Sequence, residues 1–102
     1  MKRNGKHKMK NNCEIPQSLL VEFNHATAKA VAIAGSFNNW RPESLPMIAF
    51  GHGRWLKELV LPPGSYEYLI VMDGQWIPDP SAKETVPNPF GGVNSLAVAP
   101  NP

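Results

Sequence analysis

The sequence predicts an all-β protein, an antiparallel β-sandwich of about seven short strands. Two observations support this class. No window longer than a few residues shows the period of an amphipathic helix. Segments of alternating side chains instead recur between turn signals, at the spacing of roughly 8 to 12 residues that sandwiches show. The 102 residues fit one domain, which can bury a core without disulfides or a metal.

The basic charge is concentrated at the amino terminus. Five of the ten basic residues lie in positions 1–10, whereas residues 11–102 carry five basic and eight acidic side chains, a net charge of −3. We therefore expect a disordered basic tail at 1–15 and a mildly acidic domain at 16–102. Such a tail can contact nucleic acid or an anionic surface, but a solvated, solubilising tail is the favoured interpretation, so a nucleic-acid partner is disfavoured.

The first half of the domain contains four predicted strands. Trp40 ends a polar turn after the second strand, and Pro42 and Pro46 keep the following piece from forming a helix. Trp55 lies inside an alternating strand, and it is the tryptophan that we expect in the core. The strands are expected at 19–23, 29–34, 47–50 and 54–61.

Residues 66–76 form the segment around which the rest of the chain is organised. Residues 66–72 alternate, so that Tyr66, Tyr68, Ile70 and Met72 share one face and Glu67, Leu69 and Val71 share the other. Asp73-Gly74 is a strong hairpin signal, because the tightest hairpin turns need positive φ angles. Trp76 follows this rigid turn, where its ring can be held toward a ligand.

The segment after this hairpin is rich in proline. Four prolines in 77–92 exclude a helix and a central strand, and we expect no regular structure there. Long irregular segments are usually functional or packed against the domain. A last alternating strand is expected at 94–99.

Signatures of catalysis are poor, and we expect no enzyme activity, no cofactor and no metal centre. The chain has no Gly-rich phosphate loop and no Gly-x-Ser-x-Gly motif. Its single cysteine, Cys13, lies in the expected tail, and Asp73 and Asp79 are explained by turns and local hydrogen bonds. No apolar run approaches the roughly 18 residues that span a membrane, and we read no export signal. We expect a cytoplasmic protein.

The remaining candidates for chemistry are aromatic and amide side chains. Trp40 and Trp76 both lie at turns, and each alone is explained equally well as a core residue. Together with Asn38, Asn39 and Asn94 they suit a neutral, polyhydroxylated ligand, because an indole stacks on the C–H face of a sugar while amides bond its hydroxyls. A nucleic-acid groove would interleave cations with these aromatics, and few cations lie near them.

Four motifs in order give the sequence a family resemblance. They are GSFNNW at 35–40, LPPGxYxY at 61–68, DGQWxxDP at 73–80 and NPFGGxNS at 88–95. Together they resemble carbohydrate-binding module family 48, the glycogen-binding domain of the β subunit of AMP-activated protein kinase and of the amino termini of branching and debranching enzymes. The resemblance covers about residues 18–99, nearly the whole domain.

The resemblance implies an immunoglobulin-like sandwich that binds α-1,4-linked glucans of the glycogen or starch type, or maltooligosaccharides, without cleaving them. It implies that Trp40 and Trp76 flank the sugar helix, that Phe90 enters its curve, and that Asn94 bonds its hydroxyls. The sequence departs from the family at two positions. Kinase-type modules have a basic residue that contacts sugar at the position of Leu69, and the loop threonine of the family is replaced near Gly92. A hydrogen bond to a charged group is worth roughly 1.5–3 kcal/mol, so we expect weaker binding than in the kinase modules.

A protein-interaction module of the same fold is the alternative. It would dock on a kinase, a phosphatase or a glycan-processing enzyme. Leu69 and Val71 on the outer face of their strand favour this hypothesis, because adjacent exposed apolar side chains often mark a contact.

Overall fold

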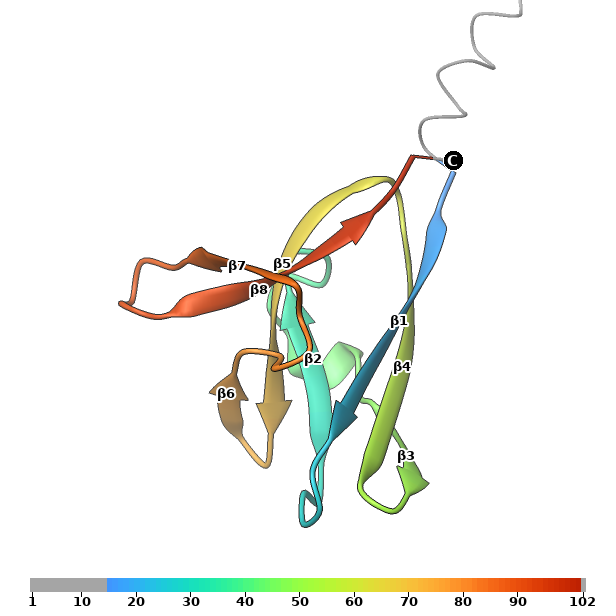
Figure 1. Ribbon diagram of the computed structural model, residues 1–102, viewed down its shortest axis with the longest axis vertical. Coiled ribbons are helices and arrows are strands. Elements are labelled where there is room, and N and C mark those ends of the chain that lie inside the picture. The colour runs from blue at the N-terminus through green and yellow to red at the C-terminus, as the bar shows by residue number, and fades with distance from the viewer. Residues whose placement is uncertain (1–14, 102) are drawn as a thin grey trace, which may run out of the picture.

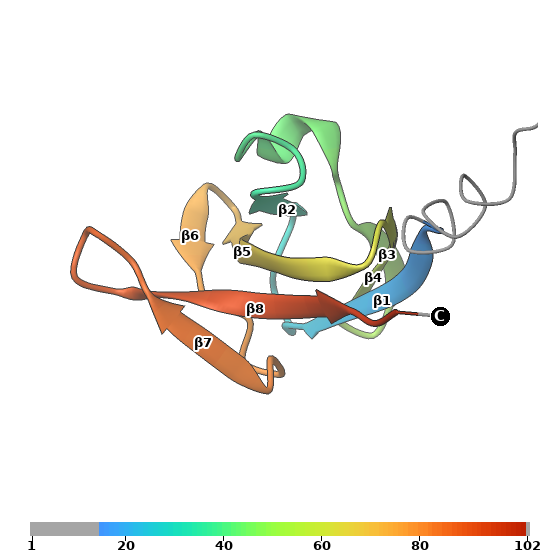
Figure 2. The same cartoon turned by 90° about the horizontal axis from the view of Figure 1, so that it is seen from above.

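The computed structural model describes residues 15–101, which form eight strands in two antiparallel sheets (Figures 1 and 2). The first sheet has the order β1-β4-β3, and the second has the order β2-β5-β8-β7, with β6 pairing with the end of β5. The antiparallel sandwich is confirmed. The strands are β1 Gln17–Asn24, β2 Val31–Gly35, β3 Ile48–Gly51, β4 Arg54–Leu61, β5 Gly64–Met72, β6 Gln75–Ile77, β7 Glu84–Pro87 and β8 Val93–Ala99.

The core lies between the inner faces of the two sheets. Ile33 of β2 and Ile70 of β5 are paired across the second sheet, and both are fully buried. Phe23 of β1 belongs to the same apolar cluster from the first sheet. Trp55 is half-buried and packs against this cluster, as expected from its place inside a strand. Full burial of each large apolar side chain contributes about 1.5–3 kcal/mol.

The hairpin at Asp73-Gly74 is confirmed. Both residues have positive φ angles, 50° and 84°, as the tightest two-residue hairpin turn requires. The Asp73 carboxylate also accepts hydrogen bonds from the backbone N–H groups of Lys29 and Ala30, at 3.0 and 2.8 Å. The side chain that favours the turn therefore also fixes the chain entering β2.

The prediction that 77–92 lacks regular structure is wrong at one place, because β7 lies within it. β7 pairs with β8 and forms the edge of the second sheet, and Pro87 is its last residue. An edge strand leaves one side of its backbone unpaired, so a proline there removes little hydrogen bonding. The prolines excluded a central strand correctly, but they did not exclude this edge strand. Pro42 is the first residue of a single 3-10 turn, η1 (Pro42–Ser44), and Pro46 lies just after it.

The bend between β6 and β7 is held by a buried carboxylate. Asp79 is only 5% exposed, and its Oδ2 accepts a hydrogen bond from the Tyr68 hydroxyl at 2.6 Å. Its Oδ1 accepts from the Ser81 N–H, and its own N–H donates to Ser95 Oγ at 2.8 Å. Burial, together with the neighbouring carboxylate, raises the pKa of the Tyr68 hydroxyl well above its usual range. The local bonds expected for Asp79 are present, and contacts to β5 and β8 extend them.

Two expectations from the sequence concern the amino-terminal tail and a membrane-spanning segment. Most of the expected tail, residues 1–14, lies outside the described residues, and so does Cys13. Among the described residues, the structure contains no helix of the length and apolarity needed to cross a membrane.

Candidate functional site

A groove of about 580 Å³ lies on the outer face of the second sheet. Its lining comes from four separate stretches of the chain: the loop after β2, the strand β5, the strand β6, and the loop between β7 and β8 with the start of β8. The four residues that the family resemblance implies for the site are all brought together there, whereas Asn38 and Asn39 are absent from the lining. The lining residues are Trp40, Glu67, Leu69, Trp76, Asn88, Pro89, Phe90 and Asn94.

The Trp40 side chain is positioned by a compact loop that starts at Gly35. Asn39 and Trp40 both have left-handed backbones, with φ angles of 56° and 58°, and the Trp40 N–H donates to Gly35 O at 2.9 Å. A Cβ on Gly35 would lie 2.6 Å from the backbone oxygen of Glu67, so glycine is required for this close approach.

Asn38 serves this loop and does not serve a ligand. Its Oδ1 accepts from the Gly35 N–H at 2.8 Å, and its Nδ2 donates to the carbonyl oxygens of Ile33 and Arg41. These bonds occupy both donors of the amide. Asn38 is absent from the groove lining, so the suggestion that it faces a ligand is wrong.

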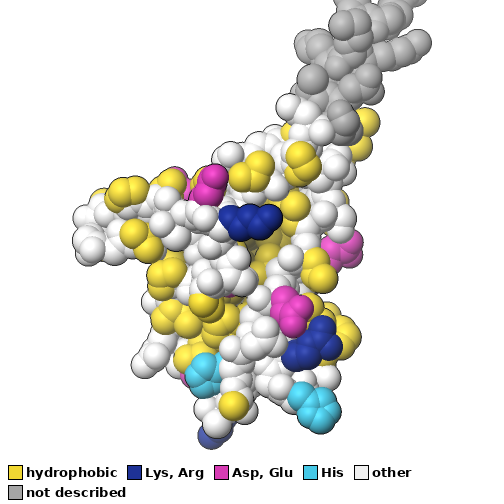
Figure 3. Space-filling view, viewed as in Figure 1, with side chains coloured by type: hydrophobic (Ala, Val, Ile, Leu, Met, Phe, Trp, Pro, Cys, Tyr) yellow, Lys and Arg dark blue, Asp and Glu magenta, His cyan; other side chains and the backbone are white. Residues whose placement is uncertain are grey.

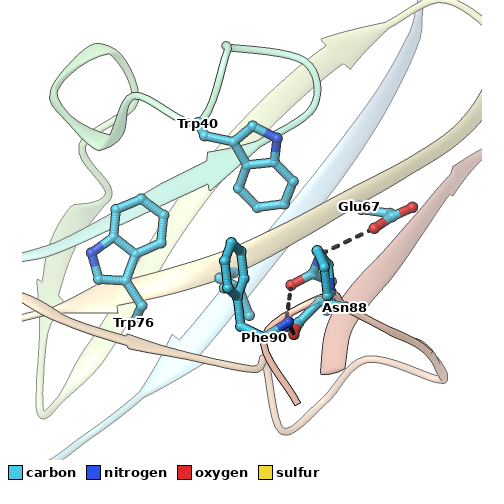
Figure 4. Close-up of a pocket in the computed structure, with 8 residues that line it drawn as sticks. Trp40, Glu67, Trp76, Asn88 and Phe90 are labelled. Atoms are coloured by element: carbon cyan, nitrogen blue, oxygen red, sulfur yellow. Dashed lines mark hydrogen bonds between the residues drawn. The ribbon is translucent and has the colours of Figure 1, made fainter. Parts of the chain in front are cut away.

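Trp76 stands on the outer face because of its register in the β5–β6 hairpin. It pairs with Val71, whereas its neighbour Ile77 pairs with the buried Ile70. The indole is 47% exposed. Figure 4 shows the rings of Trp40 and Trp76 bordering one space, with the phenyl ring of Phe90 directed into it. In Figure 3, apolar side chains gather on the surface over β6.

Phe90 lies at the tip of the loop between β7 and β8, and it is 92% exposed. Asn88 shapes this tip: its Oδ1 accepts from the N–H groups of Phe90 and Gly92, at 2.9 and 3.1 Å, and its own N–H donates to Gly92 O at 3.0 Å. The donor that Gly92 contributes is therefore engaged within the loop. A large ring held out of the core in this way is available for contact.

Asn94 is 7% exposed and forms the polar wall of the groove. Its Nδ2 donates to Glu67 Oε1 at 3.0 Å, and its Oδ1 accepts from Asn88 Nδ2 at 3.2 Å (Figure 4). A side-chain amide has two donors and two lone pairs, so one of each is left by these bonds. The pair of partners fixes the orientation in which the remaining donor and lone pair are presented.

Leu69 and Val71, the apolar pair expected on the outer face of β5, are not both exposed. Leu69 is half-buried and lies in the groove. Val71 is only 9% exposed, and it lines a second, smaller cavity together with Pro42 and Pro46 of the loop between β2 and β3. The expectation of two adjacent exposed apolar side chains is therefore wrong for Val71, which is buried.

Sequence reasoning missed two polar residues of the groove, Glu67 and Asn88. The alternation of β5 places Glu67 on the same face as Leu69, so that pattern carried the signal. Asn88 precedes a proline, which is typical of a turn, and its contact with Asn94 depends on the β7–β8 pairing that the sequence did not reveal.

The composition of the groove favours binding over reaction. Three aromatic rings, Leu69 and Pro89 give an apolar lining, and the polar groups are two amides and one carboxylate. The described residues contain no cluster of three or more His, Cys, Asp or Glu side chains that would hold a metal ion. Asp79 is turned to the interior, where Tyr68 and Ser95 engage it.

Comparison with known proteins decides the family. The family model for the glycogen recognition site of AMP-activated protein kinase matches residues 17–101. The chain belongs to this family. The resemblance to the glycogen-binding domain of carbohydrate-binding module family 48 is thereby confirmed.

Curated relatives of this glycogen-recognition domain are kinase subunits. The 5'-AMP-activated protein kinase subunits beta-2 of Mus musculus and Homo sapiens are each 41% identical over 68 residues, which cover 67% of this chain and 24% of theirs. Subunit beta-1 of Sus scrofa is 40% identical over 68 residues, 52% of its length. The chain thus matches about a quarter of the length of the first two relatives.

A solved structure supports the fold of the domain. The maltogenic amylase from S. marinus superimposes with a TM-score of 0.66 over 83% of this chain and 14% of the amylase. The sequence identity is 20%, so the likeness extends to the fold alone.

Proposed function

We propose that this domain binds α-1,4-linked glucans, of the glycogen or starch type, without cleaving them. One observation carries the proposal: Trp40, Trp76 and Phe90 come from three separate segments, yet their rings border a single groove with amides on its wall (Figure 4). Indole faces stack on the C–H faces of sugars, and rigid aromatic side chains lose little entropy on binding. Family membership and the kinase subunits among its relatives support the same ligand.

Each groove residue has a distinct role in this proposal. Trp40 and Trp76 flank the curved glucan, and Phe90 enters its concave side. Asn94 bonds sugar hydroxyls through the donor and lone pair that Glu67 and Asn88 leave free. Neutral hydroxyls fit neutral amides, and the site holds no group arranged for general acid and base chemistry, so the domain acts as a non-enzymatic module.

Affinity is expected to be modest. At Leu69 the groove lacks the cationic donor of the kinase modules, and the Gly92 N–H is used by Asn88. A hydrogen bond to a charged group is worth roughly 1.5–3 kcal/mol, so its loss lowers affinity by about tenfold or more. Binding then rests chiefly on aromatic contact.

The test is calorimetric titration with maltoheptaose and with its seven-glucose cyclic equivalent. Wild type is expected to bind both ligands, and Trp76→Ala is expected to abolish measurable heat. Phe50→Ala is the matched control, because Phe50 is an exposed aromatic residue on β3 of the other sheet. Absence of heat with the folded wild type, or undiminished binding by Trp76→Ala, would contradict the proposal.

A protein contact is the second candidate function, and its best surface differs from the one expected. Leu20 and Val60 are 70% and 62% exposed on β1 and β4, and Ile48 of β3 is 56% exposed. Their positions in the register place them on the outer face of the first sheet, away from the groove. The relatives are subunits of a kinase, so a kinase catalytic subunit is the partner that we propose for this face. Leu20→Lys should weaken such a complex while leaving glucan binding intact, which co-purification and titration would measure.

The cellular setting is part of the proposal. The charge pattern supports a division into a tail at 1–15 and a domain at 16–102, and the single cysteine fits a cytoplasmic location. Deleting residues 1–12 should leave glucan affinity unchanged, because the groove is built from residues 40–94. A loss of affinity on deletion would assign the tail a role in the site.

A further inference from the structure

The groove carries a negative charge at one defined place. Glu67 is the only ionisable side chain among the eight residues that line it. It stands on the outer face of β5 and is exposed, and its Oε1 accepts a hydrogen bond from Asn94 Nδ2 at 3.0 Å. The amide is a neutral partner, so it orients the carboxylate without neutralising it. This hydrogen bond engages one of the two carboxylate oxygens.

No cation among the described residues offsets this charge at the groove. The next side chain along the same face of β5 is Leu69, which is apolar. Arg41 follows Trp40 in the chain, but its side chain is absent from the lining. The one ion pair that the structure shows within residues 15–101 joins Arg54 to Glu22 on the first sheet. Among the residues that line the groove, Glu67 is therefore the one source of formal charge.

Glucans differ in charge, which makes this carboxylate a determinant of specificity. An unmodified glucan is neutral, whereas a phosphate monoester carries about −1.5 to −2 charges at pH 7. Placing like charges together costs affinity, and a repulsive element in a site is an effective way to reject one of two similar ligands. Glu67 lines the same groove as the three aromatic rings, so a glucan bound there would lie in the field of its carboxylate.

We propose that Glu67 makes the groove selective for neutral glucans over glucans that carry phosphate esters, an inference that rests on the proposed glucan-binding function. Glu67 has two effects here. Its hydrogen bond presents the Asn94 amide to a neutral sugar, and its charge opposes an anionic group on the same sugar. The residue that supports binding of one ligand class thus excludes the other.

The experiment compares two ligands on the same protein. Maltoheptaose and maltoheptaose phosphorylated at C6 of an internal glucose are titrated by calorimetry in 20 mM and 300 mM salt. We expect wild type to prefer the neutral ligand by about tenfold or more in low salt. The preference should shrink in high salt, where charges on a surface are screened over about 6 Å instead of about 20 Å.

The variant Glu67→Gln isolates the charge, because glutamine keeps an oxygen that can accept from Asn94 Nδ2. The ratio of the two affinities should fall at least threefold in this variant. Glu58→Gln removes the same charge from the first sheet, and it should leave the ratio at its wild-type value.

The outcomes separate the two proposals. Binding of maltoheptaose with a ratio near one, or a ratio unchanged in Glu67→Gln, overturns the selectivity proposal and leaves glucan binding intact. A ratio that falls equally in Glu58→Gln overturns it too, because net charge would then account for the effect. If the folded wild type binds neither ligand, glucan binding and the selectivity proposal both fail.

Discussion

Replacing Phe90 by alanine separates binding from folding more cleanly than any other change in the groove. The ring is 92% exposed, so its removal takes almost no packing from the folded domain. Surface substitutions of this kind change the free energy of unfolding by about 0.5 kcal/mol or less. The backbone of the loop should also persist, because Asn88 holds it through the N–H groups of residues 90 and 92.

The expected loss of affinity follows from the area that a glucan would cover. A phenylalanine side chain offers about 200 Å², and covering half of the exposed part removes about 90 Å² from water. At about 25 cal/mol per Å² this contributes about 2.3 kcal/mol, which is about 40-fold in the dissociation constant.

Calorimetric titration with maltoheptaose measures this loss, and thermal unfolding of the same samples measures stability. Phe50→Ala is the control, since Phe50 is 58% exposed on the other sheet. It should change neither affinity nor stability by a comparable amount. A Phe90→Ala variant that binds within twofold of wild type would refute the reasoning, because the ring would then lie outside the contact. A large fall in its melting temperature would refute the assignment of Phe90 as an unpacked residue.

Three further predictions follow from the groove and from the buried network. Leu69→Lys places an ammonium group in the groove and should tighten maltoheptaose binding by roughly tenfold in a titration. Asn88→Ala removes the acceptor for two loop N–H groups and a donor to Asn94, and it should weaken binding at least tenfold with a smaller change in melting temperature. Tyr68 has a raised pKa in the folded state, so above pH 10 the folded protein holds a proton that the unfolded chain has lost, and stability should decrease as pH rises. Urea unfolding between pH 8 and pH 11 would show this slope, and Tyr68→Phe should remove much of it while costing about 1–3 kcal/mol at neutral pH.

The sheet structure was predictable because local signals agreed with the tertiary structure. Alternation located β5, and the Asp-Gly pair located the hairpin with both of its positive φ angles. β7 escaped notice because an edge strand tolerates prolines that would exclude a central one, and its pairing with β8 brings together residues that are up to 12 positions apart. No short-range turn signal therefore marked the pairing, and the proline-rich composition of 77–92 suggested a loop.

The candidate site was predictable to a different degree for its aromatic and its polar parts. Trp40 and Trp76 lie at turns, where a large ring cannot easily be packed, so position alone drew attention to them, whereas Phe90 was identified only through the family resemblance of the 88–95 motif. The roles of the asparagines could not be separated in this way, because every asparagine near a turn offers the same amide. Only the three-dimensional partners distinguish Asn38, which is used up by its own loop, from Asn94, which faces the groove.

Each of the three aromatic residues is positioned by its own local backbone structure, and this affects the entropy cost of binding a ligand in the groove. Trp40 depends on a left-handed loop anchored to Gly35, Trp76 on the two-residue hairpin, and Phe90 on the amide of Asn88. None of these anchors needs a ligand, so the backbone segments that carry the rings are arranged before a glucan binds, which lowers the ordering cost of the proposed binding. In the proposed glucan binding, this arrangement would offset part of the affinity lost with the cationic donor. It also locates the weak points of the site: a side chain added at residue 35 would meet the Glu67 backbone at 2.6 Å, and would displace Trp40 without touching the sugar.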